Sequence, residues 1–496
     1  MPAVSALFHR QPAVRSPMVL LMALALPLMV VTFLASFDQG AAIAPRQQPD
    51  VRPVDVDEVT TLAPSSSHAP SIATTAAPST VTRARDRLLP VASVRLPPLP
   101  FHPRFTRMCP ALPGVVMGLT RAGFVHNDSA NGSSILVPCN SRQLAPVLVK
   151  EYLGVKLITN IIGVVKNYCL GSQKTRQLAC RRELAKLDGC EDYNALGVQP
   201  AQFMLPAECS VMLARNASLL IKPADGFHGA GIEYFPRPPN LTYCQAQTSA
   251  IGQLYVTNPA LLAGGKKFDV RTWVLVAHVD PLIVFHADGF ARVSARAFSI
   301  ADEDPMAHIT NAHGQEASSG HFRTFNSMHD ELAAAYGWPA DYFSRTFREH
   351  VDKAVRFAVL AQFKTWFGAF PNKPRAGIMH LFAADWVIDT AGKAHLLELN
   401  GLPDQGFKVP GDNQRWADMM ALVLMLHWEP ERIFNPARGA GAVSRAGVWQ
   451  RGANVVGDAL RANAFQFGAW RLVFNERETA FDRVNVCDEY GRQRRR

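Results

Sequence analysis

Asp385, Glu398 and Asn400 together have the side chains of a magnesium site. Two carboxylates that lie close together repel each other unless a proton or a cation separates them. Carboxylate and amide oxygens are hard ligands that suit Mg²⁺, and phosphate groups can complete its coordination shell. The three residues therefore predict chemistry on a phosphorylated substrate.

A predicted hairpin would bring these residues together. The strand-like segment FAADWVID ends at Asp389, a short loop follows, and the segment AHLLEL begins at Ala394. If Asp389 pairs with Ala394, Asp385 lies opposite Glu398, with Cβ atoms about 4.5–5.5 Å apart. Asn400 shares that face because side chains alternate along a strand. The alternative is an accidental meeting of two solvated carboxylates, since a slip of one residue would undo the pairing.

A lysine followed by a glycine-rich loop forms a second pattern. An apolar segment ends in Lys222, and Gly226, Gly229 and Gly231 come shortly after it. Glycines let backbone N–H groups approach a phosphate chain, and a lysine on the strand supplies a point charge. The alternative interpretation is an ordinary surface hairpin.

A third pattern is a strand with one charged face, formed by Lys267, Asp269 and Arg271. The other face carries Val270, Thr272, Val274 and Val276. An exposed strand with a ladder of ion pairs would look the same and would contribute little. Because the following residues are nearly all apolar, we favour a strand that enters the core and ends at a cleft.

The whole chain must supply the elements that position these residues. It has 496 residues, of which 48% are hydrophobic, so several domains and a sizeable core are expected. This excludes a disulfide scaffold and a wholly disordered chain. Helical periodicity over 329–369 and 412–428 predicts helices packed beside the sheet. The net charge is +10, but six surplus arginines lie near the termini, so nucleic acid is not an expected partner.

The N-terminus carries an apolar run, 18–35, preceded by Arg10 and Arg15. Its length is at the short end of the roughly 17–25 residues that span a bilayer. We expect a signal anchor, with a cleaved signal peptide and an organellar transit peptide as alternatives. The flanking arginines favour a lumenal catalytic domain in the endomembrane system or Golgi, or a secreted protein, over a cytosol-facing domain.

A stretch rich in Pro, Ser and Thr, 38–105, follows and predicts a disordered stem. Eight cysteines show no CxxC zinc spacing, and their pairing stays open. Four N-x-S/T sequons would be acceptors only in a secretory lumen.

Several blocks in chain order resemble the tubulin-tyrosine-ligase-like (TTL-like) family of ATP-grasp ligases. They are NYCLGSQKTR (167–176), QPAQFMLP (199–206), IKPADGFHGAGI (221–232), QLYVTNPALLAGGKKFDVRTWVLV (253–276), GFARVSARAFS (289–299), HITN (308–311) and ADWVIDTAGKAHLLELNGLP (384–403). No single block is unique, but their shared order is specific.

The resemblance implies an α+β ATP-grasp fold with mixed and antiparallel sheets and flanking helices. The expected parts are a cytoplasmic segment with the anchor (1–37), the stem (38–105), an N-terminal domain (106–195), a central ATP-grasp subdomain (196–262), a C-terminal subdomain with the metal site (263–430) and an extension with a basic tail (431–496).

The resemblance also implies a role for each site residue, with ATP and Mg²⁺ as cofactors. The residues that would bind ATP are Lys222, Gly229, Gly231, Gln253, Tyr255, Val256, Lys267, Asp269 and Thr310. Those at the acceptor and γ-phosphate end are Arg271, Arg292 and Asn311, and the metal ligands are Asp385, Glu398 and Asn400.

The implied activity is a ligase that activates a protein carboxylate as an acyl phosphate and joins it to a free amino acid. The acceptor would be tubulin if the domain faces the cytosol and is unknown if it is lumenal. Tyrosine ligase, polyglutamylase and glycylase activities all stay open.

Four departures from the family pattern leave room for a weak enzyme or a pseudoenzyme. His228 replaces an arginine, Ala384 and Trp386 replace phenylalanines, Gln177 replaces a lysine, and the segment from Leu402 replaces Ser-Pro. A second class of protein, a lumenal glycosyltransferase, would use Asp302-Glu303-Asp304 as a DxD metal site, although such a motif is common by chance.

Overall fold

The computed structural model describes the ranges 89–91, 104–107, 112–128, 133, 135–137, 157–159, 173–190, 193–226, 229–311, 315, 320–369, 377–401, 403–428, 430–434, 456–461 and 465–478. The chain divides into two compact units, Met1–Thr80 and Val81–Arg496, and every described residue belongs to the second. The predicted anchor at 18–35 lies outside the described residues.

Long strands dominate the middle of the second unit. The strands are β1 (Leu89–Val91), β2 (Arg104–Arg107), β3 (Val125–His126), β4 (Ile135–Val137), β5 (Leu157–Thr159), β6 (Gln202–Leu205), β7 (Leu219–Pro223), β8 (Glu233–Phe235), β9 (Ala250–Leu254), β10 (Leu261–Leu262), β11 (Lys266–Val279), β12 (Leu282–Ala297), β13 (Phe322–Arg323), β14 (Ile378–Ile388), β15 (Ala394–Asn400), β16 (Phe465–Phe467) and β17 (Trp470–Asn475).

Helices lie before, between and after these strands. The α-helices are α2 (Pro113–Arg121), α5 (Lys174–Leu187), α6 (Cys209–Leu213), α7 (Leu241–Gln245), α8 (Pro305–His308), α9 (Phe325–Tyr336), α10 (Arg348–Ala369), α11 (Asp412–Trp428) and α12 (Pro430–Phe434). Shorter turns are η2 (Tyr193–Leu196), η3 (Ala263–Gly265) and the π-helical η5 (Tyr342–Phe347).

The strands form two sheets. The larger sheet has the order β1-β16-β17-β12-β11-β14-β5-β4-β2-β3, with β10, β13 and β15 paired to its central strands. Its central strands are antiparallel, whereas β5, β4, β2 and β3 run parallel to one another. The smaller sheet, β6-β9-β7-β8, is antiparallel throughout. Mixed and antiparallel sheets with flanking helices agree with the predicted α+β class.

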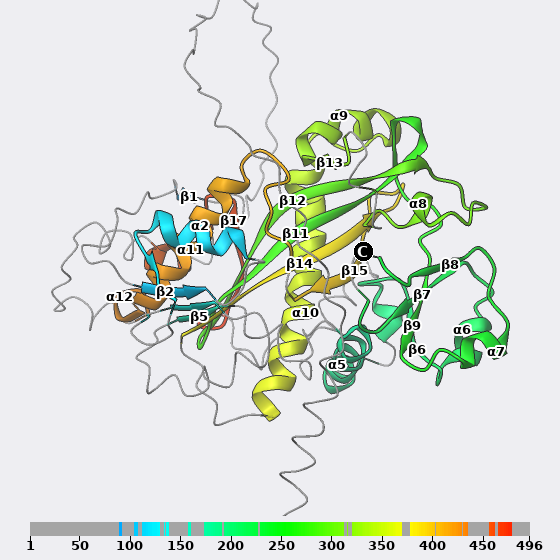
Figure 1. Cartoon of the computed structure of the whole chain (residues 1–496), viewed down its shortest axis with the longest axis horizontal. Helices are drawn as coiled ribbons and strands as arrows, with labels where there is room; N and C mark the ends of the chain where they lie inside the picture. Colours follow the sequence, from blue (N-terminus) through cyan, green and yellow to red (C-terminus); the bar gives the residue numbers. More distant parts are fainter. Residues whose placement is uncertain are drawn as a thin grey trace, which may run out of the picture. The chain divides into compact units, whose positions relative to one another are not determined.

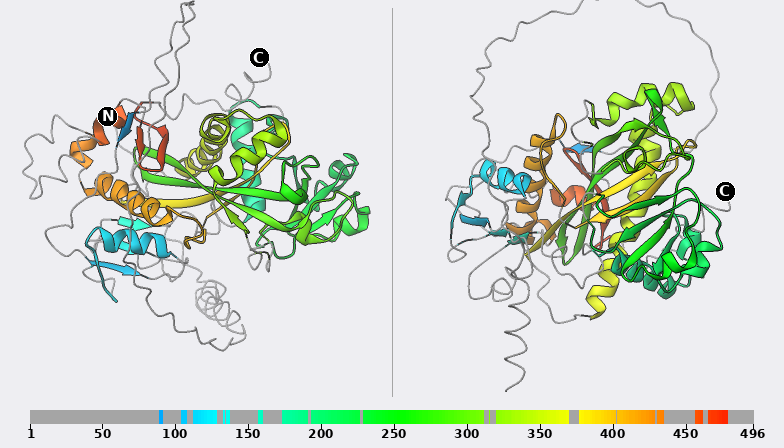
Figure 2. Two further views of the ribbon diagram at one scale, coloured as in Figure 1. Left: turned by 90° about the horizontal axis from the view of Figure 1, so that it is seen from above. Right: turned by 45° about the vertical axis from the view of Figure 1, so that its right-hand side comes forward.

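The large sheet is covered on both faces (Figure 1; Figure 2, left). On one face lies α10, and its buried side chains belong to the same core cluster as Val270, Val274 and Val276. On the other face lie α2 and α11, and their buried side chains belong to the same core cluster as Trp273 and Leu275. Central strands buried on both faces must be apolar throughout, which explains the apolar run that follows Arg271.

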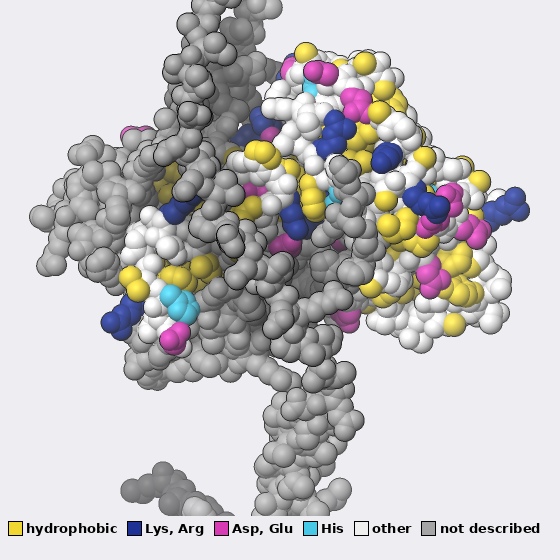
Figure 3. Space-filling model, turned by 45° about the horizontal axis from the view of Figure 1, so that its top comes forward, with side chains coloured by type: hydrophobic (Ala, Val, Ile, Leu, Met, Phe, Trp, Pro, Cys, Tyr) yellow, Lys and Arg dark blue, Asp and Glu magenta, His cyan; other side chains and the backbone are white. Residues whose placement is uncertain are grey.

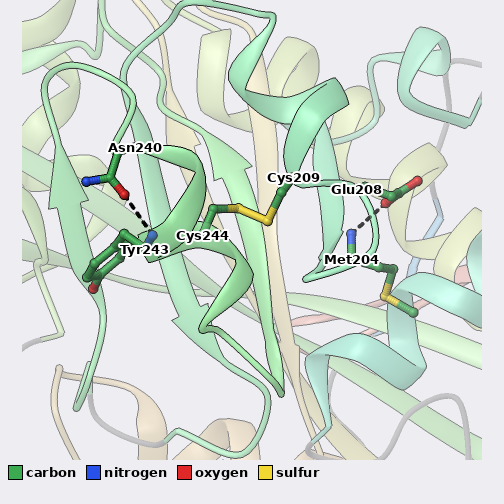
Figure 4. The surroundings of a disulfide bond; sticks show 6 residues. All are labelled: Met204, Glu208, Cys209, Asn240, Tyr243 and Cys244. Carbon is green, nitrogen blue, oxygen red and sulfur yellow. Dashed lines mark hydrogen bonds between the residues drawn. A yellow bond between two sulfur atoms is a disulfide. The ribbon is translucent and has the colours of Figure 1, made fainter.

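A disulfide joins two short helices of the small sheet's subdomain (Figure 4). Cys209 of α6 and Cys244 of α7 are both buried in the small core cluster. Asn240 caps α7, because its side chain accepts a hydrogen bond from the backbone N–H of Tyr243. The segment between the two cysteines contains Lys222 and the glycine-rich loop, so the disulfide closes the part of the chain that carries the second sequence pattern.

Two terminal segments enter the large sheet against expectation. The predicted stem supplies β1, which pairs with β16 in parallel, and the first two residues of β2. The prediction of disorder over 38–105 is therefore wrong for Leu89–Val91 and for Arg104 and Phe105. The C-terminal extension, which carries no recognisable motif, supplies β17 and pairs it with β12. These strands are short, and the partners lie far away in sequence, so periodicity gave no sign of them.

On the face drawn in Figure 3, basic and acidic side chains are interspersed. The basic surplus of the chain therefore forms no single-sign patch on the described part of that face.

Arg471 of β17 ties the C-terminal extension to the core. Its guanidinium donates to Asp288 of β12 at 3.2 Å and to Asp352 of α10 at 3.1 Å. It also lies 2.9 Å from Nδ1 of His286, which is 2.8 Å from the Asp352 carboxylate. Burial would raise the pKa of both aspartates, but Arg471 and His286, together with Arg348 at Asp288, outweigh burial and lower each pKa. Only Asp288 has a further arginine partner, Arg348.

We expect Arg471→Leu to lower the free energy of unfolding by about 3 kcal/mol, because it leaves Asp352 and Asp288 incompletely paired. The thermal unfolding midpoint of the purified chain measures this. Arg477→Leu is the matched control, since Arg477 lies exposed just after the same strand. Equal midpoints for the two variants would show that the Arg471 network is not stabilising.

Candidate functional site

A cleft lies between the small sheet and the central strands of the large sheet, and it gathers most of the predicted site residues. Its lining residues are Pro200, Leu220, Lys222, Ile232, Gln253, Leu254, Tyr255, Val256, Lys267, Asp269, Arg292, His308, Ile309, Thr310, Asn311, Asp385, Val387, Leu397 and Glu398. Four predicted residues, Gly229, Gly231, Arg271 and Asn400, lie outside this lining, although Arg271 and Asn400 bond directly to Asp385.

One end of the cleft is apolar and carries an unpaired amide. Leu220, Ile232 and Leu397 line it, and Gln253 on β9 reaches it from the small sheet. The side-chain nitrogen and oxygen of Gln253 are buried without a hydrogen-bond partner among the described residues. Buried polar groups are rarely left unpaired, so this amide fits a ligand that both donates and accepts, as the edge of a purine does.

Two buried lysines stand in the middle of the cleft. Lys222 on β7 is 4% exposed, and Lys267 on β11 is 7% exposed. Burial lowers the pKa of Lys222 to about 8, and Glu398 partly opposes that effect. Burial lowers the pKa of Lys267 to about 7, opposed in part by Asp269. Two buried lysines from opposite sheets fit a polyanionic ligand, because the negative charge of the ligand would stabilise the protonated form of both amines.

The glycine-rich loop lies beside the lysines. Gly229 and Gly231 have φ angles of +72° and +70°, which side chains other than glycine rarely adopt. Lys174 on α5 donates to the backbone oxygen of Gly226 at 2.8 Å and so connects the loop to the helix. His228, one of the departures from the family pattern, lies outside the described residues.

A ladder of alternating charges crosses the large sheet at the far end of the cleft. Arg271 donates two hydrogen bonds of 2.8 Å to the Asp385 carboxylate, from Nε and Nη2. Nη2 of Arg292 lies 3.0 Å from the Oδ2 atom of Asp385, and Arg292 also binds both oxygens of Asp269. Asp269, predicted to bind ATP, lines the cleft but already has Arg292 as a strong partner.

Arginine charge determines how this ladder is ionised. Burial would raise the pKa of Asp385, but Arg271 and Arg292 outweigh burial and hold that pKa well below its usual range. Burial would lower the pKa of Arg292, and the charges of Asp269 and Asp385 raise it above its ordinary value instead. Asp385 is therefore an anion at any physiological pH, the charge state that a cation ligand needs.

The hairpin places Asp385 opposite Glu398, as predicted, but by a different register. Ile388, and not Asp389, pairs with Ala394, because the Asp389 carboxylate accepts from two N–H groups of the loop and stays in the turn. A β-bulge at Leu397 then shifts the strand by one residue and restores the Asp385–Glu398 pair.

The oxygen-rich end of the cleft fits a magnesium ion. The Nδ2 atom of Asn400 lies 2.9 Å from Oδ2 of Asp385 and 3.3 Å from Oε1 of Glu398, so the amide stands between the two carboxylates. Lys174 adds a positive charge 3.9 Å from Oε2 of Glu398. Two facing carboxylates and an amide form a donor set of the kind that Mg²⁺ accepts beside phosphates.

Sequence reasoning missed Lys174 and His308. Both lie inside blocks that carried the resemblance, so their position in NYCLGSQKTR and HITN was the available signal. Gln177, which replaces a family lysine, donates to the backbone oxygen of Leu399 and fastens α5 to β15. Lys174 lies one turn earlier on the same helix and brings a positive charge to the metal end.

The alternative DxD motif forms a turn. The Asp304 side chain caps α8 by accepting from the backbone N–H of Met306, and Asp302 accepts from the N–H of Asp304. Among the described residues, which include 302–304, no group of three or more His, Cys, Asp or Glu side chains is placed to hold a metal ion. The motif therefore lends no support to a glycosyltransferase.

Comparison with known proteins supports the family resemblance of the seven sequence segments. Residues 162–432 match the model of the tubulin-tyrosine ligase family. The chain is 29% identical over 170 residues to the protein polyglycylase TTLL10 of Rattus norvegicus, which covers 32% of this chain and 24% of the relative. It is 23% identical over 284 residues to the tubulin polyglutamylase TTLL5 of Mus musculus, which covers 52% of this chain and 20% of the relative.

A third relative carries a different description. The chain is 29% identical over 163 residues to a human protein named inactive polyglycylase TTLL10, which covers 30% of this chain and 23% of the relative. The chain therefore spans about a quarter or less of the length of these three relatives.

The predicted location, an endomembrane or Golgi membrane protein with a lumenal catalytic domain or a secreted protein, is wrong. A relative is named for acting on tubulin, which a lumenal domain would not meet. Within the part of the chain that the structure describes, no helix is both long and apolar enough to cross a membrane.

Proposed function

Because the chain belongs to the tubulin-tyrosine ligase family, we propose that it is an ATP-dependent ligase that joins an amino acid to a protein carboxylate. The observation that carries the proposal is the convergence of Lys222, Lys267, Asp385 and Glu398 on one cleft beside the unpaired amide of Gln253. That order of groups suits a nucleotide whose base lies at Gln253 and whose phosphates lie between the lysines and the carboxylates.

The residues of the charged end would act by positioning and by neutralising charge. An oxygen of the acceptor carboxylate attacks the γ-phosphorus, the bond to the bridging oxygen breaks, and ADP leaves. The amine of the amino acid then attacks the acyl carbon, phosphate leaves, and a proton passes to solvent. Arg292 and Asn311, which line the cleft, would orient the acceptor and the γ-phosphate, and Arg271 would act there through Asp385, so no protein nucleophile is needed.

Asp385, Glu398 and Asn400 would hold Mg²⁺, which when bound neutralises charge on the phosphates. The relatives' names suggest glycine or glutamate as the amino acid and tubulin as the first acceptor to test.

A second candidate function is nucleotide binding without turnover. One relative is named inactive, and the Asp385 carboxylate is already bound by Arg271, Arg292 and Asn400. Such a protein would keep the affinity of the lysines for ATP but would form no amide bond.

The experiment is incorporation of radiolabelled glycine, glutamate or tyrosine into purified tubulin by the full chain, with MgATP, and with ADP release measured in parallel. Label in tubulin together with stoichiometric ADP supports the ligase. ATP binding by calorimetry with neither label nor ADP supports the non-catalytic alternative. No binding of ATP would contradict both proposals.

We expect the affinity for ATP to fall as the pH rises above about 7. Only the protonated lysines bind phosphate well, and in the free protein the pKa values of Lys267 and Lys222 are about 7 and about 8. As the pH rises, these lysines lose their protons, and ATP binding must then be coupled to proton uptake, which weakens it. Calorimetric affinity should be at least about tenfold weaker at pH 9 than at pH 6.5. Lys267→Met should bind more weakly and show a shallower dependence; equal slopes for both proteins would contradict the role of Lys267.

A further inference from the structure

His308 stands where the two sheets meet. It ends α8, a short helix that contacts β8 of the small sheet and β11 and β12 of the large one. Its ring is stacked on that of Tyr234, with 3.8 Å between ring centroids and 20° between the planes. The hydroxyl of Tyr234 on β8 donates to the backbone oxygen of Ile300 at 2.7 Å, which connects the small sheet to the segment that follows β12.

The hydrogen bonds of His308 have a definite direction. Its Nε2 lies 2.5 Å from the backbone oxygen of Asp302, which can only accept, so Nε2 carries the hydrogen. Burial lowers the pKa of His308, so the ring is neutral and Nδ1 is an acceptor. The hydroxyl of Tyr255, 2.9 Å from Nδ1, must therefore donate to it.

The donor and acceptor roles at His308 determine those at Lys267 as well. Since the Tyr255 hydroxyl hydrogen is used by His308, the Tyr255 oxygen accepts from Nζ of Lys267, which is 2.8 Å away. Nζ also donates to the backbone oxygen of His308 at 2.6 Å. These two bonds leave one of the three ammonium hydrogens for the cleft.

We propose that His308 is a positioning residue, which acts through Tyr255 to hold Lys267 as a hydrogen-bond donor aimed at the phosphates of a bound nucleotide. This inference rests on the proposed function, because it takes ATP as the ligand of the cleft. His308 lines the cleft together with Thr310 and Asn311. The inference assigns to this histidine a positioning role, which differs from the ligand-binding roles proposed for Thr310 and Asn311.

The physical reason is the proton on Lys267. Without an acceptor at position 308, the Tyr255 hydroxyl is free to turn and donate to the lone pair of a neutral Lys267 amine. That bond favours the uncharged lysine, which binds phosphate poorly. The other charged groups near Lys267 are Asp269, which is held by Arg292, and Lys222 on the opposite sheet; neither depends on His308.

Two substitutions separate the acceptor from the ring. His308→Phe keeps a ring against Tyr234 and removes Nδ1, whereas His308→Asn removes the ring and keeps an acceptor, Oδ1, near the position of Nδ1. The backbone oxygen that binds Lys267 is present in both variants. We expect His308→Phe to bind ATP about tenfold more weakly than the unmodified chain at pH 7.5, and His308→Asn to stay within about threefold.

The pH profile provides the readout that a merely structural role would not change. Loss of charge on Lys267 weakens binding as the pH rises, and in His308→Phe this loss should begin at a lower pH than in the unmodified chain. His308→Asn should restore the original profile. Because ATP titrates identically in each measurement, differences between the proteins report on the cleft.

The outcomes distinguish this inference from the proposed function. If the unmodified chain binds no ATP, the proposed function fails. If it binds ATP and His308→Phe binds with the same affinity and pH profile, or His308→Asn is as weak as His308→Phe, the inference about His308 is overturned. Should His308→Phe not fold, Tyr255→Phe tests the same chain of bonds, and an unchanged affinity and pH profile in that variant would equally contradict it.

Discussion

Glu398→Gln is expected to lower the rate of amino-acid incorporation by at least about 100-fold while leaving the protein folded. The change keeps the size of the side chain but removes one of the two negative charges that face each other across β14 and β15. Among the described residues, the ion-pair partner of Glu398 is Lys174, and the long separation of 3.9 Å makes this a weak pair, so its loss should cost little stability. Incorporation should require more Mg²⁺ in the variant, measured by titrating the metal at fixed ATP.

Glu349→Gln is the matched control, because Glu349 is an exposed carboxylate in the first turn of α10. It should leave both the rate and the Mg²⁺ dependence unchanged. Full incorporation by Glu398→Gln would contradict the metal assignment. A thermal midpoint close to the assay temperature would instead attribute the lost activity to unfolding.

Gly289→Ala is expected to destabilise the chain by about 3 kcal/mol or more and to lower activity as well. Gly289 is the extra residue of a β-bulge, opposite Arg271 and Thr272 of β11. A Cβ atom there would lie 2.2 Å from the backbone oxygen of Arg271 and 3.1 Å from the indole nitrogen of Trp273. Backbone in the middle of a sheet cannot yield as a flexible side chain can.

The activity loss follows from the position of the clash. Moving the Arg271 backbone displaces the guanidinium that holds Asp385. Gly406→Ala is the control, since the nearest atom there is the end of the flexible Asp404 carboxylate, 3.2 Å away. Thermal midpoints and incorporation rates of both variants measure the effect. A Gly289→Ala protein as stable as Gly406→Ala would show that the β11–β12 bulge adapts.

The β14–β15 hairpin shows what the local sequence pattern could predict. Asp385, Glu398 and Asn400 belong to one hairpin, so alternation and a short turn were enough to predict that they meet. The predicted register was nevertheless one residue off near the turn, because the Asp389 side chain bonds the loop backbone. A bulge at Leu397, which no periodicity reveals, compensated for that error.

The lysines of the cleft show where local pattern ends. Lys222 and Lys267 could each be placed at the end of a strand, but they come from different sheets. Their proximity, their burial and their lowered pKa values depend on how the sheets face each other. The same holds for Lys174, which reaches Glu398 across more than two hundred positions of sequence.

The sequence by itself determined the family and, through that resemblance, the α+β class. It also indicated the residue types at the strand ends, because alternation along strands and glycine in loops are local properties of the backbone. Tertiary structure decided which charges pair: Arg271 and Arg292 on Asp385, Arg471 on two aspartates, and Tyr255 between His308 and Lys267. It also decided that β1 and β17 complete the sheet. Burial strengthens such pairings and makes unpaired charges costly, and burial exists only once distant segments have packed together.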